Sequence, residues 1–240
     1  NYKNLLTGKA LIMYSPNKNK NVQNLDRKIN ISNIYSNNRL GLNDSVEGGQ
    51  SLTLGLDYEL IDKNNNSILS GGLASVLRDK NETLPSKSTL NNRTSDIVGS
   101  INFKPKKNFN LKYDFSLDNN FGSTNYNFLS TDLIVNKFVT SFEYMQEDDE
   151  IGNENYYSGE MKFLFNENNS LKYRTRRNKK TDLTEYYNLI YEYKNDCLTA
   201  AIKYNKDYYS DKDLKPNEEI FFSISFIPFS SVNSPSKRKW

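Results

Sequence analysis

From Gln50 onward the chain alternates apolar and polar residues with a period of two, in segments of about ten residues separated by Asn, Asp, Gly and Lys. In one such segment every second residue is apolar: Leu52, Leu54, Leu56 and Tyr58. A later segment repeats the pattern with Leu111, Tyr113, Phe115 and Leu117. Since successive side chains of a strand point to opposite faces, the pattern predicts β-strands with one apolar and one polar face.

We expect roughly a dozen strands in antiparallel up-and-down order, because most of the connections are tight. Expected hairpins include one between 96–104 and 108–118, and one between 124–131 and 134–145 with its turn at 132–133. Strands of about ten residues suit a membrane barrel better than a sandwich, whose strands are usually about 5–6 residues long. A polar face turned inward suits a barrel wide enough for a wet lumen. The predicted fold is therefore all-β, an antiparallel up-and-down transmembrane β-barrel.

Composition agrees with a folded β-protein that has no membrane-spanning helix. Aromatic residues make up 13% of the chain although the mean hydropathy is −0.79, and disordered chains are poor in aromatics. No run of about 18 apolar residues occurs, but spanning strands need only one apolar face. The net charge of +3 is too small to favour nucleic acid as a partner.

The stretch Asn38–Gly49 precedes the regular alternation and ends in two glycines. Taken alone, it is interpreted as a turn that leads into the first regular strand of a meander. Upstream of it we expect a short strand at Ala10–Tyr14, a polar loop over 17–30 and a short strand at 31–35. The expected divisions are 1–49 as strands and loop leading into this stretch, 50–229 as barrel strands, and 230–240 as a polar tail.

Several short motifs, in order along the chain, resemble those of the lipopolysaccharide-assembly outer-membrane LptD (OstA/Imp) family. Asn38–Gly49 resembles N-R-F-S-G-x-D-R-x-E-G-G, with Leu40 in place of the aromatic and Ser45 where a basic residue is usual. Residues 92–99 resemble D-x-T-S-D-[IV]-V-G, and 195–198 and 208–216 resemble the cysteine-bearing strand start and the D-x-D-L-x-P turn. The motif residues are Asn38, Arg39, Gly41, Asp44, Glu47, Gly48, Gly49, Thr94, Ser95, Asp96, Gly99, Asp213 and Pro216.

The resemblance implies about half the wall of one large barrel, with an N-terminal periplasmic domain and earlier strands outside this chain. Asn1 follows no leader segment, so we expect the chain to be part of a longer protein. The implied function is to insert lipopolysaccharide into the outer leaflet of the cell outer membrane, at the end of a periplasmic bridge. The implied partners are lipopolysaccharide, an LptE-like plug lipoprotein, and an LptA-like bridge that binds the missing domain.

Cys197 is the single cysteine of the chain and cannot form an internal disulfide. The resemblance implies that it pairs with a cysteine of the missing N-terminal domain, as the oxidising periplasm permits. The alternative is a free thiol. Asp196 stands where relatives often carry a second, adjacent cysteine.

Three cations, Lys172, Arg174 and Arg176, alternate along one strand and therefore share a face. They are candidate contacts for anionic lipid, since Arg binds phosphate in a bidentate manner; the alternative is ordinary solvated charge. The acidic run 146–150 lacks the spacing of a Ca²⁺ loop and is expected to be an exposed turn. Pro228 is a candidate gate-strand residue, because the family places prolines near the seam between the first and last strands.

No catalytic, metal or cofactor site is predicted. The chain has no His, the usual general base of outer-membrane hydrolases, and shows neither a phosphate-binding glycine loop nor Cys/His metal spacing. We therefore expect a protein that is not an enzyme. The alternative function is a passive, porin-like outer-membrane channel.

Overall fold

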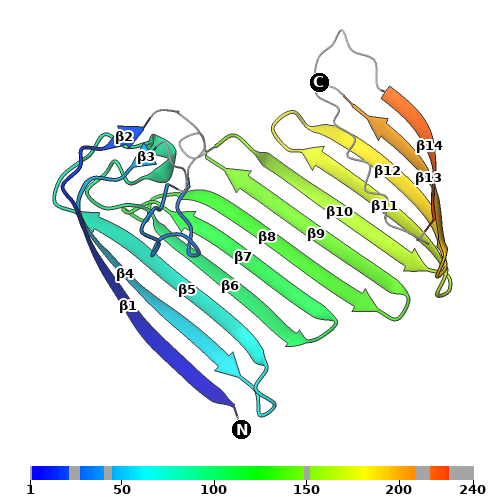
Figure 1. Cartoon of the computed structure of the whole chain (residues 1–240), viewed down its shortest axis with the longest axis horizontal. Helices are drawn as coiled ribbons and strands as arrows, with labels where there is room; N and C mark the ends of the chain where they lie inside the picture. The colour runs from blue at the N-terminus through cyan, green and yellow to red at the C-terminus, as the bar shows by residue number, and fades with distance from the viewer. Residues whose placement is uncertain (1, 22–27, 41–44, 149–151, 209–216, 227–240) are drawn as a thin grey trace.

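The computed structural model describes residues 2–21, 28–40, 45–148, 152–208 and 217–226. Nearly all of the regular structure is β (Figure 1). The strands are β1 (Lys3–Ser15), β2 (Lys20–Asn21), β3 (Ser45–Val46), β4 (Gly49–Ile61), β5 (Ser67–Arg78), β6 (Ile97–Lys106), β7 (Phe109–Leu117), β8 (Thr124–Val135), β9 (Phe138–Glu147), β10 (Asn155–Leu164), β11 (Asn169–Asn178), β12 (Leu183–Lys194), β13 (Leu198–Asp207) and β14 (Asn217–Phe226). One 3₁₀ turn, η1 (Ser86–Ser88), lies between β5 and β6.

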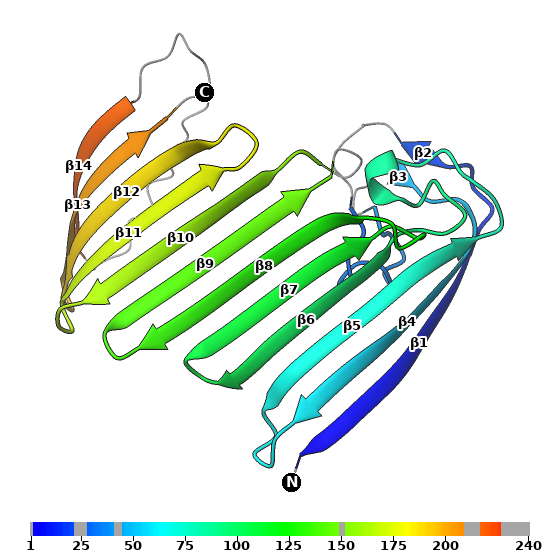
Figure 2. The same ribbon diagram turned by 180° about the vertical axis from the view of Figure 1, so that it is seen from behind.

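Twelve strands form one sheet in which every neighbouring pair is antiparallel and all but one follow directly in sequence. The exception is β1 and β4, since the chain leaves the sheet after β1, forms the small β2–β3 ribbon and returns beside β1. Within the described residues the sheet is open, with β1 at one edge and β14 at the other (Figure 2). The predicted all-β, antiparallel up-and-down fold is confirmed.

The alternation read from the sequence divides the sheet into two chemically different faces. Residues paired across strands lie on the same face. Thr53 of β4 pairs with Val76 of β5, and Ala74 of β5 pairs with Val98 of β6. Since Ala74 and Val76 are two residues apart and share a face of β5, all four residues lie on one face of the sheet. This inner face carries most of the small and charged residues, whereas the outer face carries Leu54, Leu56 and other apolar side chains that are more than one-third exposed. The pattern is that predicted for a wide barrel wall.

The connections differ in length between the two ends of the sheet. Every connection at one end is short (62–66, 107–108, 136–137, 165–168 and 195–197), whereas the other end carries the long segments 16–48 and 79–96 besides shorter ones such as 179–182 (Figures 1 and 2). The turn predicted at 132–133 was placed too early, since β8 runs to Val135. Asn136 makes this turn with a φ of 52°, a left-handed conformation that Asn tolerates better than most residues.

Residues 28–40, here called the insert, lie on the inner face of β4–β6. The predicted strand at 31–35 is wrong, because these residues form turns. The Asn30 carboxamide accepts hydrogen bonds from the backbone N–H groups of Ser32 and Asn33, at 2.9 and 3.1 Å. An Asn side chain that binds its own following backbone in this way competes with strand formation.

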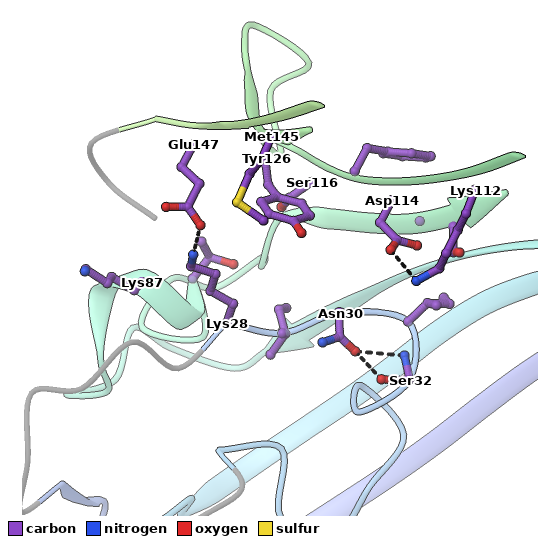
Figure 3. A pocket seen from close by; sticks show the side chains of 16 residues that line it. Lys28, Asn30, Ser32, Lys87, Lys112, Asp114, Ser116, Tyr126, Met145 and Glu147 are labelled. Atoms are coloured by element: carbon purple, nitrogen blue, oxygen red, sulfur yellow. Dashed lines mark hydrogen bonds and ion pairs between the residues drawn. The ribbon is translucent and has the colours of Figure 1, made fainter. Parts of the chain in front are cut away.

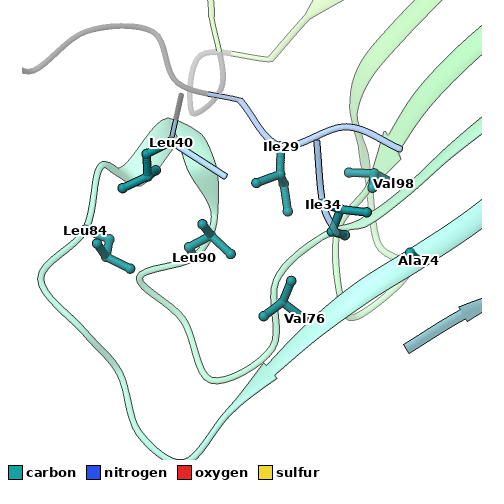
Figure 4. Packing of buried hydrophobic residues seen from close by; sticks show 8 residues of the cluster. All are labelled: Ile29, Ile34, Leu40, Ala74, Val76, Leu84, Leu90 and Val98. Atoms are coloured by element: carbon teal, nitrogen blue, oxygen red, sulfur yellow. The ribbon is translucent and has the colours of Figure 1, made fainter. Parts of the chain in front are cut away.

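One hydrophobic core joins the insert, the inner face and the β5–β6 loop (79–96) (Figure 4). Its buried members are Ile29, Ile34, Leu40, Ala74, Val76, Leu84, Leu90 and Val98. Ile34, Val76 and Leu90 are wholly excluded from solvent. Their contacts hold two long loops against the wall. Among the described residues, no helix has the length and apolarity needed to cross a membrane.

Candidate functional site

A buried ionic network fixes the end of the insert to the wall, and it is built from the Asn38–Gly49 motif. Arg39, which is 2% exposed, donates from Nε to the Glu47 carboxylate at 3.0 Å. It also donates to Thr53 Oγ1 at 3.0 Å and to Ser51 Oγ at 2.7 Å, both on the inner face of β4. The stretch does lead into β4, where the uninterrupted meander begins, but it is more than a turn, because Arg39 and Glu47 join the insert to the wall.

Arg78, at the end of β5, completes the network. Its Nη2 donates to Glu47 at 2.6 Å and its Nη1 to the Gly48 carbonyl oxygen at 3.1 Å. The side chains of Arg39, Arg78 and Glu47 are at most 2% exposed. A buried charge that loses its partner destabilises the fold by about 3–5 kcal/mol. Each member of this network is therefore required by the others.

The two glycines of the motif meet different steric demands. A Cβ on Gly48 would lie 2.0 Å from the carbonyl oxygen of Asn17, a backbone atom that cannot move aside without moving the segment after β1. Gly49 has a φ of 82°, a conformation that side chains disfavour. The glycines thus bring the chain into β4 at close range, as their predicted role in a turn requires.

The second motif forms another buried cluster, centred on Asp96. Its Oδ2 accepts hydrogen bonds from Ser116 Oγ at 2.8 Å and Asn125 Nδ2 at 2.9 Å, and its backbone N–H donates to Thr89 Oγ1 at 3.0 Å. Ser95 Oγ accepts from the Val76 N–H at 2.9 Å. Asp96 therefore links the β5–β6 loop to β7 and to Asn125 in β8. Gly99 lies opposite Phe115 on the outer face, and the Phe115 ring occupies the space that a Cβ at position 99 would need.

The Tyr35 hydroxyl lies against β4 at Gly55, in the space that a side chain at that position would fill. A Cβ on Gly55 would lie 2.0 Å from the Tyr35 hydroxyl, so any larger residue at position 55 would displace the insert. Lys9 lies 5.4 Å from the Tyr35 ring centroid and forms an ion pair with Asp57. Burial, followed by the negative charge of Asp57, raises the pKa of Tyr35, which keeps the phenol neutral at physiological pH.

A cavity of about 410 Å³ lies between the start of the insert and the inner face of β6–β9 (Figure 3). Two ion pairs line it: Lys28 with Glu147, and Lys112 with Asp114 at 2.6 Å. Tyr126 and Met145 lie beside the Glu147 side chain (Figure 3), and Ser100 and Ser116 add hydroxyl groups. The cavity offers charged, hydroxyl and aromatic groups within one enclosure.

Glu147 overturns the expectation of an exposed acidic turn at 146–150. It ends β9, is 6% exposed, and pairs with Lys28 across the cavity. Residues 149–151 lie outside the described part of the chain. Where the chain is described, no group of three or more acidic or Cys side chains is placed to hold a metal ion.

Lys172, Arg174 and Arg176 lie on the inner face of β11, each beside a carboxylate. Glu160 accepts from Lys172 and from Arg174, each at 2.7 Å. Arg176 contacts Glu154 at 2.8 Å and Glu185 at 2.7 Å, and its guanidinium lies 3.7 Å from the Tyr156 ring centroid. The row is paired with acidic residues, and its contact with anionic lipid stays a prediction.

Cys197 is exposed and lies in the 195–197 turn between β12 and β13, at the end of the sheet that carries the short turns. The Asn195 side chain shapes this turn by accepting hydrogen bonds from the N–H groups of Cys197 and Leu198, at 3.0 and 2.7 Å. Gly41, Asp44, Asp213, Pro216 and Pro228 lie outside the described residues.

Sequence reasoning missed Arg78, Lys28 and Glu147, which bind residues far away in the chain. A basic residue that ends an apolar strand, as Arg78 does after Leu77, was the only available signal. Nothing in the local sequence pairs Lys28 with Glu147. Such partners depend on how the loops fold back over the sheet.

Comparison with known proteins identifies the family. A search of curated proteins gave no match. The family model described as LptD, LPS transport system D, matches residues 1–156, which is well over half of the 240-residue chain. The matched part contains the buried Arg39–Glu47–Arg78 network, the Asp96 cluster and the cavity. By its family match and its twelve-stranded antiparallel sheet, the chain belongs to the LptD family of lipopolysaccharide transport proteins.

Proposed function

We propose that this chain forms part of the wall of an outer-membrane β-barrel that inserts lipopolysaccharide into the outer leaflet, at the end of a periplasmic transport bridge. Membership of the LptD family is the observation that carries the proposal. The two faces of the sheet and the two ends of its strands support it.

The outer face has the chemistry of a lipid-facing surface. Ile12, Phe222 and Phe226 are 81%, 75% and 79% exposed, and they belong to a continuous series of outward apolar side chains on the strands. A monomeric soluble protein rarely exposes so large an apolar area to water. Hydrocarbon as the surrounding solvent removes this cost.

Aromatic side chains gather toward both ends of the outer face. Near the short turns, Phe163 lies 5.2 Å from Phe138 and 5.0 Å from Phe165, measured between ring centroids. Near the opposite end, Tyr187 lies 5.9 Å from Tyr208. Outer-membrane barrels carry aromatic girdles at both membrane interfaces, and the two groups of rings match such girdles.

The short turns suggest which end faces the periplasm. Outer-membrane barrels have short periplasmic turns and longer extracellular loops. By this rule Cys197 faces the periplasm and the insert folds in from the extracellular side. Cys197 is then exposed where a disulfide to a periplasmic domain can form. Mass spectrometry of the non-reduced full-length protein tests this pairing, and a free thiol at Cys197 would disprove it.

The partners proposed are lipopolysaccharide, an LptE-like plug lipoprotein inside the barrel, and an LptA-like bridge that docks on a preceding periplasmic domain. The cation row Lys172, Arg174 and Arg176 is proposed to meet anionic groups of the lipid, which would have to compete with Glu154, Glu160 and Glu185. The insert, bound to the inner face, argues against a passive porin-like channel. A gate function for Pro228 is likewise a proposal, tested by crosslinking across the seam.

Depletion of the protein in its own host tests the proposal. We expect lipopolysaccharide to disappear from the cell surface and to accumulate behind the outer membrane, with restoration by the wild-type gene. Purified protein is expected to conduct poorly in planar bilayers. Normal surface lipopolysaccharide after depletion would contradict the proposed function, and a large steady conductance would favour the channel.

A further inference from the structure

We propose that the cavity between the insert and strands β6–β9 is a binding subsite for a sugar ring, through which the saccharide part of the exported glycolipid contacts the inner wall. This inference rests on the proposed function and adds a chemical class of ligand and a location. The residues that carry it are Tyr126, Lys112, Asp114, Lys28 and Glu147.

The lining offers both donors and acceptors at two positions. Lys112 Nζ lies 2.6 Å from Asp114, and Lys28 pairs with Glu147 (Figure 3). A sugar hydroxyl donates one hydrogen bond and accepts others. An ammonium beside a carboxylate therefore satisfies both needs of one hydroxyl or of two adjacent ones. Charged partners also make the stronger hydrogen bonds.

The cavity also has an apolar side. Tyr126 and Met145 line it together (Figure 3). A pyranose ring has a face of C–H groups that packs on an aromatic ring, while its hydroxyls point outward. Tyrosine suits such a mixed surface because it combines an apolar ring with a polar end.

The other two parts of a glycolipid fit less well. An acyl chain would bury Lys112, Asp114 and Glu147 without any polar partner in the ligand, which is costly. A phosphate group would need a marked excess of positive charge. The lining has three lysines, Lys28, Lys87 and Lys112, against Asp114 and Glu147, and the Asp96 carboxylate behind Ser116 offsets the third. The volume of about 410 Å³ falls within the range of about 300–1,000 Å³ usual for small-ligand sites.

Binding to the purified full-length protein in detergent micelles tests the subsite. The probes are a neutral oligosaccharide core freed of acyl chains and phosphate, inorganic phosphate, and a short-chain fatty acid, each titrated by calorimetry and by saturation-transfer NMR. We expect the oligosaccharide to bind and the other two probes to show no binding at this site. Lys112→Gln and Tyr126→Leu are expected to weaken oligosaccharide binding at least fivefold.

Lys162→Gln is the matched control, since Lys162 lies on the inner face of β10, pairs in register with Lys172 and does not line the cavity. Its binding is expected to stay within twofold of wild type. Circular dichroism and heat-dependent gel mobility identify any variant that fails to fold, and Ser100→Ala then replaces it as a small change in the lining. Absence of oligosaccharide binding, or equal binding by all variants, would overturn the subsite. Surface lipopolysaccharide in depleted cells reports on the proposed function separately, so the two can fail independently.

Discussion

Strands β4–β6, which carry the insert, and strands β10–β14, which do not, follow the same alternation of residues but use their inner faces differently. On β4 and β5 the inward residues Thr53, Val76 and Arg78 are buried under the insert and the β5–β6 loop. On β10 and β11 the inward Glu160 and Arg174 side chains are 29% and 48% exposed although they form an ion pair. The alternation therefore determines which face a residue occupies, and the long loops determine whether residues on the inner face are excluded from solvent.

The consequence is energetic. Buried charges without a partner cost several kcal/mol, whereas exposed ion pairs contribute about 0–1 kcal/mol. A charge removed from the covered region should therefore harm the fold far more than the same change in the uncovered region.

Arg39→Ala should lower the free energy of unfolding by about 3–5 kcal/mol, because it removes four buried hydrogen bonds and leaves the buried acceptors on Glu47, Ser51 and Thr53 without this donor. Urea denaturation in micelles, followed by far-UV circular dichroism, measures the change. Arg177→Ala is the control, since Arg177 pairs with Asp182 at an exposed site and should cost less than about 1 kcal/mol. Equal losses in both variants would contradict the network.

Ile34→Ala should cost about 3 kcal/mol, because Ile34 is 0% exposed in the core between insert and wall and truncation leaves a cavity. Ile134→Ala gives the matched comparison. Ile134 pairs with Val139 on the inner face but is 43% exposed, so its truncation should cost about 1 kcal/mol or less. A smaller loss at position 34 than at 134 would show that the insert does not pack on the wall.

Arg174→Gln should change the free energy of unfolding by less than about 1 kcal/mol, because its ion pair with Glu160 is about half exposed and Glu160 keeps Lys172 as a partner. The same denaturation assay at low and high salt measures it, and the small difference should shrink as salt screens the pair. A loss comparable to that of Arg39→Ala would erase the contrast between the two regions.

Asp62, in the β4–β5 turn, gives the smallest effect and a pH dependence. Hydrogen bonds from the Asn66 backbone N–H, the Asn66 carboxamide and the Asn64 N–H lower the pKa of Asp62. Because the folded pKa lies below the unfolded one, the stabilisation is present above the unfolded pKa of about 3.9 and is lost as the pH falls through the folded value. The protection of amides in the 62–66 turn, relative to the intrinsic exchange rate at each pH, should therefore fall below about pH 4, and Asp62→Asn should remove this acid dependence. A turn insensitive to acid would contradict the assignment.

The sequence predicted the wall well, because strand alternation is a local property. It placed Leu54 on the apolar, outward face, and its strand at 108–118 matches β7 (Phe109–Leu117) closely. Hairpin turns were predicted less accurately. The β8–β9 turn was placed at 132–133 but lies at Asn136, because no glycine or proline marks its position in the sequence.

The covered region could be predicted only in part. Resemblance singled out Arg39, Glu47 and Asp96, but their partners Arg78, Ser116 and Asn125 come from strands whose proximity follows from the tertiary fold. The turn at 31–35 contains Ile31 and Ile34 and has the composition of a strand, but the Asn30 carboxamide diverts the backbone. Local patterning cannot report that a loop folds back over a sheet.

The insert covers the inner face of β4–β6, and the accessibility of cysteines placed on that face reports whether it does so in the folded protein. In a full-length protein whose native cysteines, Cys197 included, are all replaced by serine, cysteine replaces either Ala74, which is 1% exposed beneath the insert, or Ser223, which lies on the uncovered inner face of β14. Heat-dependent gel mobility confirms that each variant is folded. A hydrophilic maleimide is then predicted to label position 223 readily, and position 74 only after unfolding. Equally rapid labelling of both positions in the folded protein would show that the insert does not cover the inner face at Ala74.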